Sequence, residues 1–460
     1  MTNSNHQANS YSCPALFITA PQSDSGKTTI VAALARYWRN KKKRVRVFKT
    51  GPDFIDPMFH EVASGYPAYQ LDIGMMGLEH CKQHLYKAAA QADLILVEGV
   101  MGMYDGHSSS ANLAQQLGIP MLAVLPAAKM AQTFGAIAYG LAHYQPDVNL
   151  FGVVANQVGS AGHAKLLQQS LPEGIEFCGA LMRDKALELP DRHLGLVQAN
   201  EIPELDAWLD NAANLLGESC PMPLPEPVTF DYVAPENNEP LLEQTPMLVG
   251  TKIAVAWDTA FAFVYRDNLN FLEQQGAELH CFSPLTQALP ECDALYLPGG
   301  YPELHSDALK SNIELTAQIK QHVSDNKPVV AECGGMLYLL ESLTDHKGKK
   351  TPMLGILPGH CQMHDKLQSI GILAAQLSLE DNVSHHNSVP TTQVLKGHCF
   401  HYSSTELELK PFVYATHIGG RPASEAVYRY QNVTASYVHW FFYSAPQVIC
   451  QWFKPTSYSS

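Results

Sequence analysis

The chain has 460 residues, of which 46% are hydrophobic and 16% charged. That length exceeds what one hydrophobic core usually serves, and the composition is that of a globular protein. We therefore expect two domains and exclude a disordered or fibrous chain. The formal net charge is −14 and the longest basic run is Lys41–Arg44, which excludes nucleic acid as the main partner.

The opening residues are polar, and no window holds the roughly 18 uninterrupted apolar residues of a membrane span. We therefore expect a cytoplasmic protein without a membrane partner. The 10 cysteines include no Cys-x-x-Cys pair. This spacing favours reduced thiols over disulfides and offers no tetrahedral metal site.

Short β-branched or aliphatic runs alternate with helical stretches through the first half of the chain. Strands are predicted at 15–20, 45–50, 94–100, 121–125 and 151–156, and helices at 28–40, 77–91, 131–143 and 162–170. Such alternation is typical of a parallel sheet covered by helices. Residues 14–216 are therefore predicted to form one doubly wound α/β domain, preceded by a flexible tail at 1–13.

The pattern collapses in the Pro-rich, polar stretch 217–250, which predicts a linker. Alternation then restarts, with strands predicted at 253–257, 279–283, 294–297 and 329–331 and aromatic strands near 437–442. Residues 251–460 are thus predicted to form a second α/β domain.

A glycine-lysine-threonine triplet lies between the first predicted strand and the first predicted helix. A phosphate-binding loop requires this context: Lys27 and backbone N–H groups would hold phosphates, and the Thr28 hydroxyl would bind Mg²⁺. Pro21 stands five positions before Gly26, where the P-loop pattern has glycine, so the loop is a variant form. The alternative is a loop that carries the triplet by chance.

Carboxylates lie near the ends of two further strands. Glu98 lies at the sheet edge where parallel sheets bind ligands and could hold Mg²⁺, with a cap or turn carboxylate as the alternative. Asp53 and Asp56 lie in a loop rich in Pro and Gly, which suits metal or substrate positioning, or a turn with Asx-type hydrogen bonds. Asp105 before Gly106 predicts, by itself, only a turn.

Cys333 differs from the other cysteines because it lies between a predicted strand and two glycines that open a helix. A sharp strand-to-helix turn exposes a side chain at the sheet edge, and the helix N-terminus is expected to lower the thiol pKa. Gly334 leaves room for substrate and for an oxyanion, and the glycine turn at Gly299 and Gly300 can supply the other donor. We predict a nucleophile, with a buried structural cysteine as the alternative.

His439, far downstream in another strand-like run, is the predicted base for this thiol, because catalytic pairs need not be close in sequence. The alternative is a structural histidine. Several other histidines lack a matching set of spaced cysteines or carboxylates, so no metal role is predicted for them. They are His360, His364, His385, His386, His398 and His401.

Seven segments, taken in order, resemble the cobyrinic acid a,c-diamide synthase family. They are residues 20–29, 51–57, 97–102, 156–160, 299–303, 332–335 and 437–439. In that family a dethiobiotin-synthetase-like P-loop domain is joined to a class I-like glutamine amidotransferase domain. The resemblance implies an ATP-dependent carbon–nitrogen ligase that amidates the a- and c-carboxylates of cobyrinic acid through acyl phosphates, with ammonia released from L-glutamine.

The resemblance also implies a role for each matching residue. Cys333 and His439 would hydrolyse glutamine. ATP would be bound by Ser23, Ser25, Gly26, Lys27, Thr28 and Thr29, with Asn156 reading the adenine. Mg²⁺ would be held by Thr28, Asp53 and Glu98, whereas Asp56 and Asp105 would place the substrate or intermediate. The implied partners are a corrinoid, L-glutamine and ATP, and a homo-oligomer is left open.

Four positions depart from the family pattern. Asp24 stands where glycine is common, Pro126 where aspartate is usual, Phe441 where a second histidine is normal, and Cys399 where glutamate is common. Two alternatives therefore stay open. One is an amidase of another tetrapyrrole, such as a cobyric acid synthase or a nickel-sirohydrochlorin diamide synthase, and the other is a P-loop switch protein with an inactive glutaminase domain.

Overall fold

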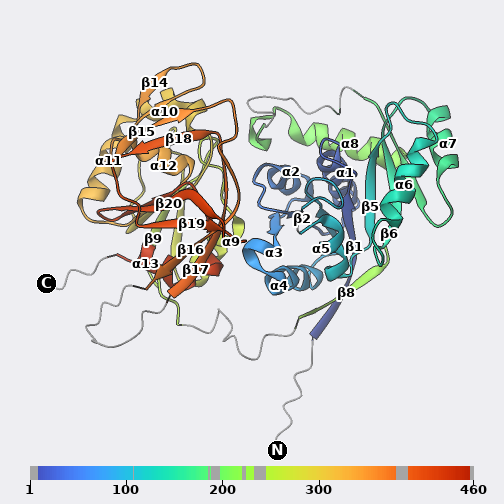
Figure 1. Ribbon diagram of the computed structural model, residues 1–460, viewed down its shortest axis with the longest axis horizontal. Coiled ribbons are helices and arrows are strands. Elements are labelled where there is room, and N and C mark those ends of the chain that lie inside the picture. The colour runs from blue at the N-terminus through green and yellow to red at the C-terminus, as the bar shows by residue number, and fades with distance from the viewer. Residues whose placement is uncertain are drawn as a thin grey trace, which may run out of the picture. The chain divides into compact units, whose positions relative to one another are not determined.

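A computed structural model of the chain describes residues 9–106, 108–184, 187, 197–219, 224–232, 245–379 and 392–455 (Figure 1). The chain separates into two compact units. Apart from Gly74–Met76, the first unit runs to Ala234 and the second from Pro235 to Ser460. Among the helices in the described ranges, none is both long enough and apolar enough to cross a membrane.

An eight-stranded sheet forms the centre of the first unit. Its strands are β1 (Asn9–Thr19), β2 (Val45–Thr50), β3 (Tyr69–Leu71), β4 (Leu94–Glu98), β5 (Met121–Pro126), β6 (Leu150–Val158), β7 (Glu176–Met182) and β8 (Pro227–Tyr232). Seven are parallel in the order β3-β2-β4-β1-β5-β6-β7. Every residue of β4 is buried, as expected for a parallel strand covered on both faces. The predicted parallel α/β fold is confirmed.

The helices of this unit lie between the strands in the chain. They are α1 (Lys27–Asn40), α2 (Ile55–Ser64), α4 (Leu78–Ala89), α5 (Ser110–Leu117), α6 (Thr133–His143), α7 (Ala161–Ser170) and α8 (Leu205–Ser219), with a 3₁₀ turn at Ala199–Glu201. The short helix α3 (Ile73–Met76) consists mostly of the residues grouped with the second unit. In α1, Ile30, Leu34 and Trp38 recur every four residues and are buried. This helix packs against α2 and α8, while α6 packs against α7 (Figure 1).

The structure differs from the predicted tail and linker. β1 begins at Asn9, within the segment expected to be a flexible tail, and its first half pairs antiparallel with β8. β8 and the last turn of α8 both lie inside the segment 217–250. Pairing with each other gives both polar segments a backbone hydrogen-bond ladder that neither has alone. The rest of that segment lies largely outside the described residues.

Two sheets build the second unit. Ten strands are ordered β10-β9-β11-β12-β21-β20-β19-β16-β17-β22, and four more are ordered β14-β13-β15-β18. The first group is β9 (Lys252–Ala256), β10 (Glu278–Phe282), β11 (Ala294–Leu297), β12 (Val329–Glu332), β16 (Ser369–Ser378), β17 (Thr392–His401), β19 (Val413–His417), β20 (Pro422–Tyr430), β21 (Val433–Ser436) and β22 (His439–Phe441). The second is β13 (Leu340–Thr344), β14 (Lys350–Pro352), β15 (Leu357–Met363) and β18 (Ser403–Leu407).

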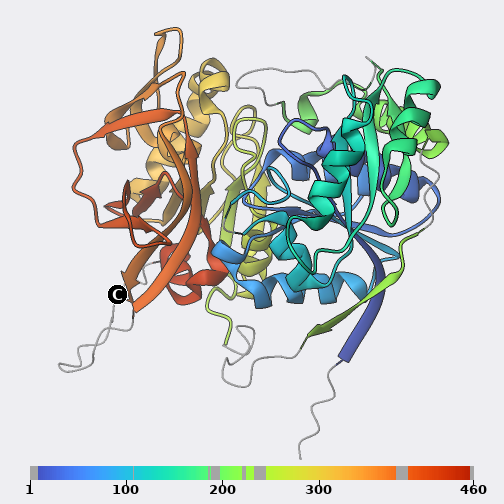
Figure 2. The same ribbon diagram turned by 45° about the vertical axis from the view of Figure 1, so that its right-hand side comes forward.

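The large sheet changes character along its width. From β10 to β21 neighbouring strands are parallel, whereas from β21 to β22 they are antiparallel. The long curved strands drawn in orange in Figure 2 belong to this antiparallel part. The helices are α9 (Arg266–Gln274), α10 (Ser306–Ser311), α11 (Ile313–Ser324), α12 (Gly334–Leu339) and α13 (Pro446–Phe453), with 3₁₀ turns at Pro302–His305 and Phe442–Ser444. The parallel part brings the ends of β11 and β12 to one edge.

Candidate active sites

The predicted phosphate loop joins β1 to α1. Gly26 precedes the helix with φ 86°, and a Cβ there would lie 2.2 Å from the side-chain nitrogen of Asn156. Only glycine fits this left-handed, close-packed position. The Asn156 amide donates to the Ser25 carbonyl at 3.0 Å, so β6 holds the loop in place. Asp24 also has a positive φ, 58°, a conformation that aspartate tolerates better than most residues.

The Lys27 side chain turns back over this loop. Its Nζ donates to the carbonyls of Gln22 at 3.2 Å and Met101 at 2.7 Å, and so connects the loops that follow β1 and β4. Burial, reinforced by nearby Lys49, lowers the pKa of Lys27. The ammonium lies at a helix N-terminus, where phosphate groups bind.

Other predicted loop residues are arranged around Lys27. Ser23 is exposed, and the Ser25 hydroxyl donates to the Gln22 carbonyl at 2.9 Å. Thr29 lies half-buried in the first turn of α1. Asp105 accepts the Gly102 N–H at 2.9 Å, which closes the turn after β4.

Glu98, at the end of β4, is the centre of a buried polar cluster. One carboxylate oxygen accepts the Thr28 hydroxyl and Lys49 Nζ, each at 2.9 Å, and the other is 2.5 Å from His60 Nε2. Lys49 Nζ also contacts the Asp56 carboxylate at 2.7 Å. No role was predicted for Lys49 or His60, although they stand at the two ends of the segment that carries Asp53 and Asp56.

Charge neutralisation explains the protonation of this cluster. Burial alone would raise the pKa of Glu98, but Lys49 and His60 together lower it, so the carboxylate stays ionised. Burial, followed by the repulsion of Asp53 and Glu98, raises the pKa of Asp56 to about 7. Lys49 thus lies between carboxylates as a metal cation would.

The donors of this cluster fit Mg²⁺ in chemical type, because Thr28 and Glu98 present hard oxygen atoms at one place. Asp53 also serves α2: one of its oxygens accepts the N–H of Ile55 at 2.7 Å and of Asp56 at 3.2 Å. The Asx-type turn considered from the sequence is therefore present, and it orients the loop beside Lys49.

Cys333 occupies a sharp turn between β12 and α12. Its backbone has φ 42° and ψ −109°, a strained conformation for a residue with a Cβ, and its N–H donates to the Ser436 carbonyl at 2.8 Å. The side chain is 7% exposed. The turn is the strand-to-helix elbow predicted from the sequence.

Glycine packing brings His439 to the same edge of the sheet. A Cβ on Gly299, after β11, would lie 2.1 Å from His439 Cε1, so the imidazole lies against the backbone there. A Cβ on Gly334 would lie 2.9 Å from the Gly300 nitrogen. The turns that carry Gly299, Gly300 and Gly334 are therefore in contact, next to Cys333 and His439.

The charge state of this pair differs from the expectation. Burial, followed by the charge of Glu303, raises the pKa of Cys333 to about 12, so the prediction of a lowered thiol pKa was wrong. The six-residue helix α12 does not offset the loss of water around the sulfur. Burial, followed by His398 and His401, lowers the pKa of His439 to about 3. Thiol and imidazole are both neutral at pH 7.

Two side chains that the sequence did not single out fix the strand that carries His439. Glu332 accepts the Trp440 N–H at 3.0 Å and the Tyr296 hydroxyl at 2.8 Å. Asn268 donates to the Trp440 carbonyl at 2.7 Å and accepts the Phe442 N–H at 2.9 Å. Buried hydrogen bonds on both sides of β22 thus orient the imidazole through the backbone.

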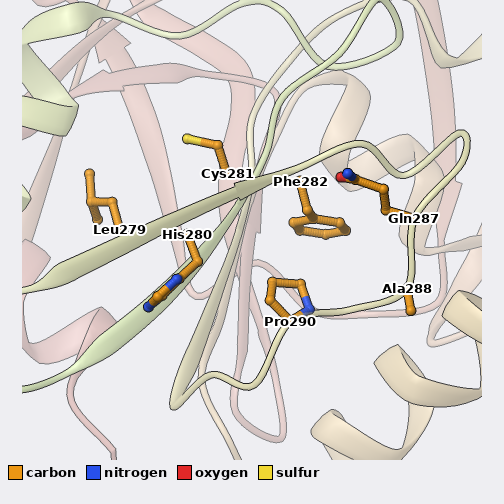
Figure 3. Close-up of a pocket in the computed structure, with 7 residues that line it drawn as sticks. All are labelled: Leu279, His280, Cys281, Phe282, Gln287, Ala288 and Pro290. Carbon is orange, nitrogen blue, oxygen red and sulfur yellow. The ribbon is translucent and has the colours of Figure 1, made fainter.

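A surface pocket at β10 lies apart from this chemistry. It is lined by Leu279, His280, Cys281, Phe282, Gln287, Ala288 and Pro290 (Figure 3). The strands β9 and β11 separate β10 from β12, and neither Cys333 nor His439 lines the pocket. Cys281 is exposed there, which makes it a useful reference thiol.

Comparisons with known proteins match both units. Residues 16–197 match the model of the CobQ/CobB/MinD/ParA nucleotide binding domain, and residues 252–447 match the model of the CobB/CobQ-like glutamine amidotransferase domain. The class I-like amidotransferase assignment made from the sequence agrees with the second match.

Similar proteins share nearly the whole chain. A hydrogenobyrinate a,c-diamide synthase of Pseudomonas aeruginosa is 48% identical over 96% of this chain and 98% of its own length. A protein of the same name from Stutzerimonas stutzeri is 48% identical over 97% of this chain and 100% of its own. A cobyrinate a,c-diamide synthase of Herminiimonas arsenicoxydans is 41% identical over 96% of both chains. The chain therefore belongs to the cobyrinate and hydrogenobyrinate a,c-diamide synthase family.

Proposed function

We propose that this protein amidates the a- and c-carboxylates of a corrinoid, using ATP to activate each carboxylate and glutamine as the ammonia source. One observation carries the proposal. A P-loop with a buried carboxylate cluster and a cysteine elbow with an adjoining imidazole occur in one chain. The relatives named for hydrogenobyrinate and cobyrinate supply the substrate class.

In the thiol site, Cys333 attacks the side-chain amide carbon of glutamine, and its proton passes to His439. The N–H groups of Gly300 and Gly334 stabilise the oxyanion. His439 then protonates the leaving ammonia, and water hydrolyses the thioester to glutamate. Since both groups are neutral at rest, proton transfer accompanies the attack rather than preceding it.

In the phosphate site, the γ-phosphoryl group of ATP moves to a corrinoid carboxylate, and ADP leaves. Ammonia attacks the acyl phosphate carbon and releases phosphate, so an amide replaces the carboxylate. Lys27 and the N–H groups of the loop hold the phosphates, and Asn156 contacts the adenine. We assign the substrate or intermediate to Asp56 and Asp105.

Mg²⁺ would be held by Thr28, Asp53 and Glu98, and would neutralise charge on the transferring phosphoryl group. Lys49 already pairs with Glu98 and with Asp56. We propose that it remains as a fixed cation beside the metal.

The experiment offers cobyrinic acid and hydrogenobyrinic acid in separate reactions, each with ATP, Mg²⁺ and either glutamine or ammonia, with product masses as the readout. We expect two successive replacements of hydroxyl by amino groups. Cys333→Ser should abolish the glutamine-supported reaction and keep the ammonia-supported one, whereas Cys281→Ser should change neither. Failure to amidate either corrinoid with either nitrogen source would sink the proposal.

Offering both substrates also tests which of the two corrinoids the protein amidates better. The two relatives at 48% identity are named for hydrogenobyrinate, and the one at 41% for cobyrinate. We therefore expect hydrogenobyrinic acid to react at least as well as cobyrinic acid. ATP-dependent assembly without amide formation would instead favour the switch-protein alternative.

A further inference from the structure

Three metal-binding side chains meet inside the second unit, outside the proposed catalytic groups. They are Cys399 and His401 on β17 and Glu425 on β20. The Cys399 sulfur, a His401 ring nitrogen and a Glu425 carboxylate oxygen all lie within 4.8 Å of one another. Their exposed fractions are 0%, 8% and 5%. The expectation that no histidine has a matching cysteine or carboxylate set therefore does not hold for His401.

Sheet curvature produces this cluster. In the sheet order, β16 and β19 separate β17 from β20, so the two strands would be about 14 Å apart if the sheet were flat. Their side chains meet because the antiparallel strands curl and bring two inner faces together. Leu395, Cys399 and His401 alternate on the buried face of β17, which directs the last two inward.

The protonation of His401 is fixed by its backbone contact. Nδ1 lies 2.8 Å from the Ser403 carbonyl, and a carbonyl only accepts, so Nδ1 carries the proton. Nε2 lies 3.5 Å from a Glu425 oxygen, which also accepts the Ser424 hydroxyl at 2.9 Å. This is longer than the 2.7–2.9 Å of a charge-assisted hydrogen bond. In neutral His401 an imidazole lone pair therefore faces a carboxylate.

A cation could bind both the Nε2 lone pair and the Glu425 carboxylate. Donation of the other ring N–H to a carbonyl is the arrangement that orients metal-binding histidines. Donor atoms in a tetrahedral zinc site lie about 3.5 Å apart, so small side-chain rotations would bring this set to bonding distance. The Tyr437 ring stacks on His401 with centroids 3.8 Å apart, and the Tyr437 hydroxyl contacts the Ser403 side chain at 3.0 Å. The imidazole is thus held rigidly before any ion binds.

We propose that Cys399, His401 and Glu425 form a binding site for a divalent transition-metal cation, with Zn²⁺ as the reference ion. A thiolate and an imidazole favour Zn²⁺ or Co²⁺ over Mg²⁺. The Cys399 thiol releases its proton to solvent when the ion binds. The bound ion links β17 to β20 and stabilises the folded second unit, because the separated strands of the unfolded chain do not present the set. None of the three residues is a proposed catalytic group, although His401 is close enough to His439 to lower its pKa.

The test measures Zn²⁺ binding to the full-length, chelator-treated protein by competition with a chromophoric chelator. We expect one equivalent per chain in the wild type. Cys399→Ser and His401→Gln should each weaken binding at least about 100-fold, since loss of a supporting group alone costs 10- to 100-fold. Two control variants should bind as the wild type does: Cys361→Ser, which alters another buried thiol of this unit, and Cys333→Ser, which removes the proposed nucleophile.

Co²⁺ provides a second readout that does not depend on how well the serine variant folds. Wild-type protein with Co²⁺ should show a thiolate-to-cobalt charge-transfer band in the near ultraviolet. Cys399→Glu keeps an ionisable ligand and should bind Co²⁺ without that band. The site is refuted if wild-type protein binds no Zn²⁺ at micromolar free ion. Full binding by Cys399→Ser, or loss of binding in Cys333→Ser alone, would also reject it, the latter by moving the ion to the nucleophile.

Discussion

The phosphate site and the thiol site handle charge in opposite ways. Around Glu98, buried charged groups are paired with one another. Lys49 lies between the carboxylates of Asp56 and Glu98, and His60 contacts the other oxygen of Glu98. Around Cys333, burial leaves thiol and imidazole neutral. A site for phosphates and a metal needs fixed charges before its ligands arrive, whereas a site for a neutral amide needs charge only during the reaction.

The largest expected effect separates the two sites by activity. Cys333→Ser should lower glutamine-supported amidation by about 10⁴-fold or more, because no other group supplies the nucleophile. Ammonia-supported amidation should stay near the wild-type rate. Steady-state rates with each nitrogen source give the comparison, with Cys281→Ser as the matched control. Equal loss with both sources would show that the sites are not separable.

The paired charges of the phosphate site should matter for stability. Lys49→Met leaves Glu98 buried beside Asp56 without its cation, and such breaks cost about 3–5 kcal/mol. Hydrogen exchange of the β4 amides measures the local free energy of opening. Lys82→Met breaks a surface pair with Glu79 and should cost below about 1 kcal/mol. Similar costs for both variants would contradict the role of the buried network.

Lys27→Ala tests phosphate binding itself. Loss of a positioned charge of this kind typically lowers turnover about 10²- to 10³-fold, and here the loss should appear with glutamine and with ammonia alike. Hydrolysis of glutamine without ATP should be unchanged. Lys41→Ala, at the other end of the same helix, serves as the control in both assays. An effect confined to the glutamine reaction would place Lys27 in the wrong site.

A smaller effect concerns Glu303, whose charge contributes to the raised pKa of Cys333. Burial raises the pKa of Glu303 from 4.5 to about 7. Because the pKa of Glu303 is higher in the folded than in the unfolded protein, its contribution to the free energy of unfolding is complete below pH 4.5. That contribution is lost as pH rises through 7. Glu303→Gln, which mimics the protonated form, should therefore gain about 3 kcal/mol relative to the wild type between pH 4 and pH 8.

Thermal unfolding of both proteins across this pH range measures the gain, and Glu314→Gln, at an exposed position of α11, provides the control. Because the Glu303 charge also raises the pKa of Cys333, the same variant should react faster with iodoacetamide at pH 8. A pH-independent difference between Glu303→Gln and the wild type would argue against this assignment.

The sequence was informative about the parallel strands and poor on the antiparallel ones. β4 opens with an unbroken apolar run, Leu94–Val97, as expected for a strand buried on both faces. β16 and β17 instead alternate buried with exposed residues and include His, Gln and Ser, so they resemble loops when read alone. β8, flanked by prolines, was likewise predicted as linker and is defined only by its pairing with β1.

The residues of the candidate sites were likewise predictable only where their context is local in the sequence. Lys27 and Cys333 lie in short motifs whose strand-to-helix context is visible locally. Asn268 acts on Trp440, 172 residues away, and Lys49 acts on Glu98, 49 residues away. No local pattern reports such partners. The thiol pKa was predicted in the wrong direction because a helix start is visible in sequence, whereas the depth of burial is not.

The most direct test of two cooperating sites follows the nitrogen atom. Wild-type protein is incubated with hydrogenobyrinic acid, ATP, Mg²⁺ and glutamine labelled with heavy nitrogen at its amide, in the presence of unlabelled ammonia. Mass spectrometry of the product should find the label in both new amides, and no label when Cys333→Ser is used. Unlabelled amides from the wild-type protein would contradict glutamine hydrolysis at Cys333 as the nitrogen source.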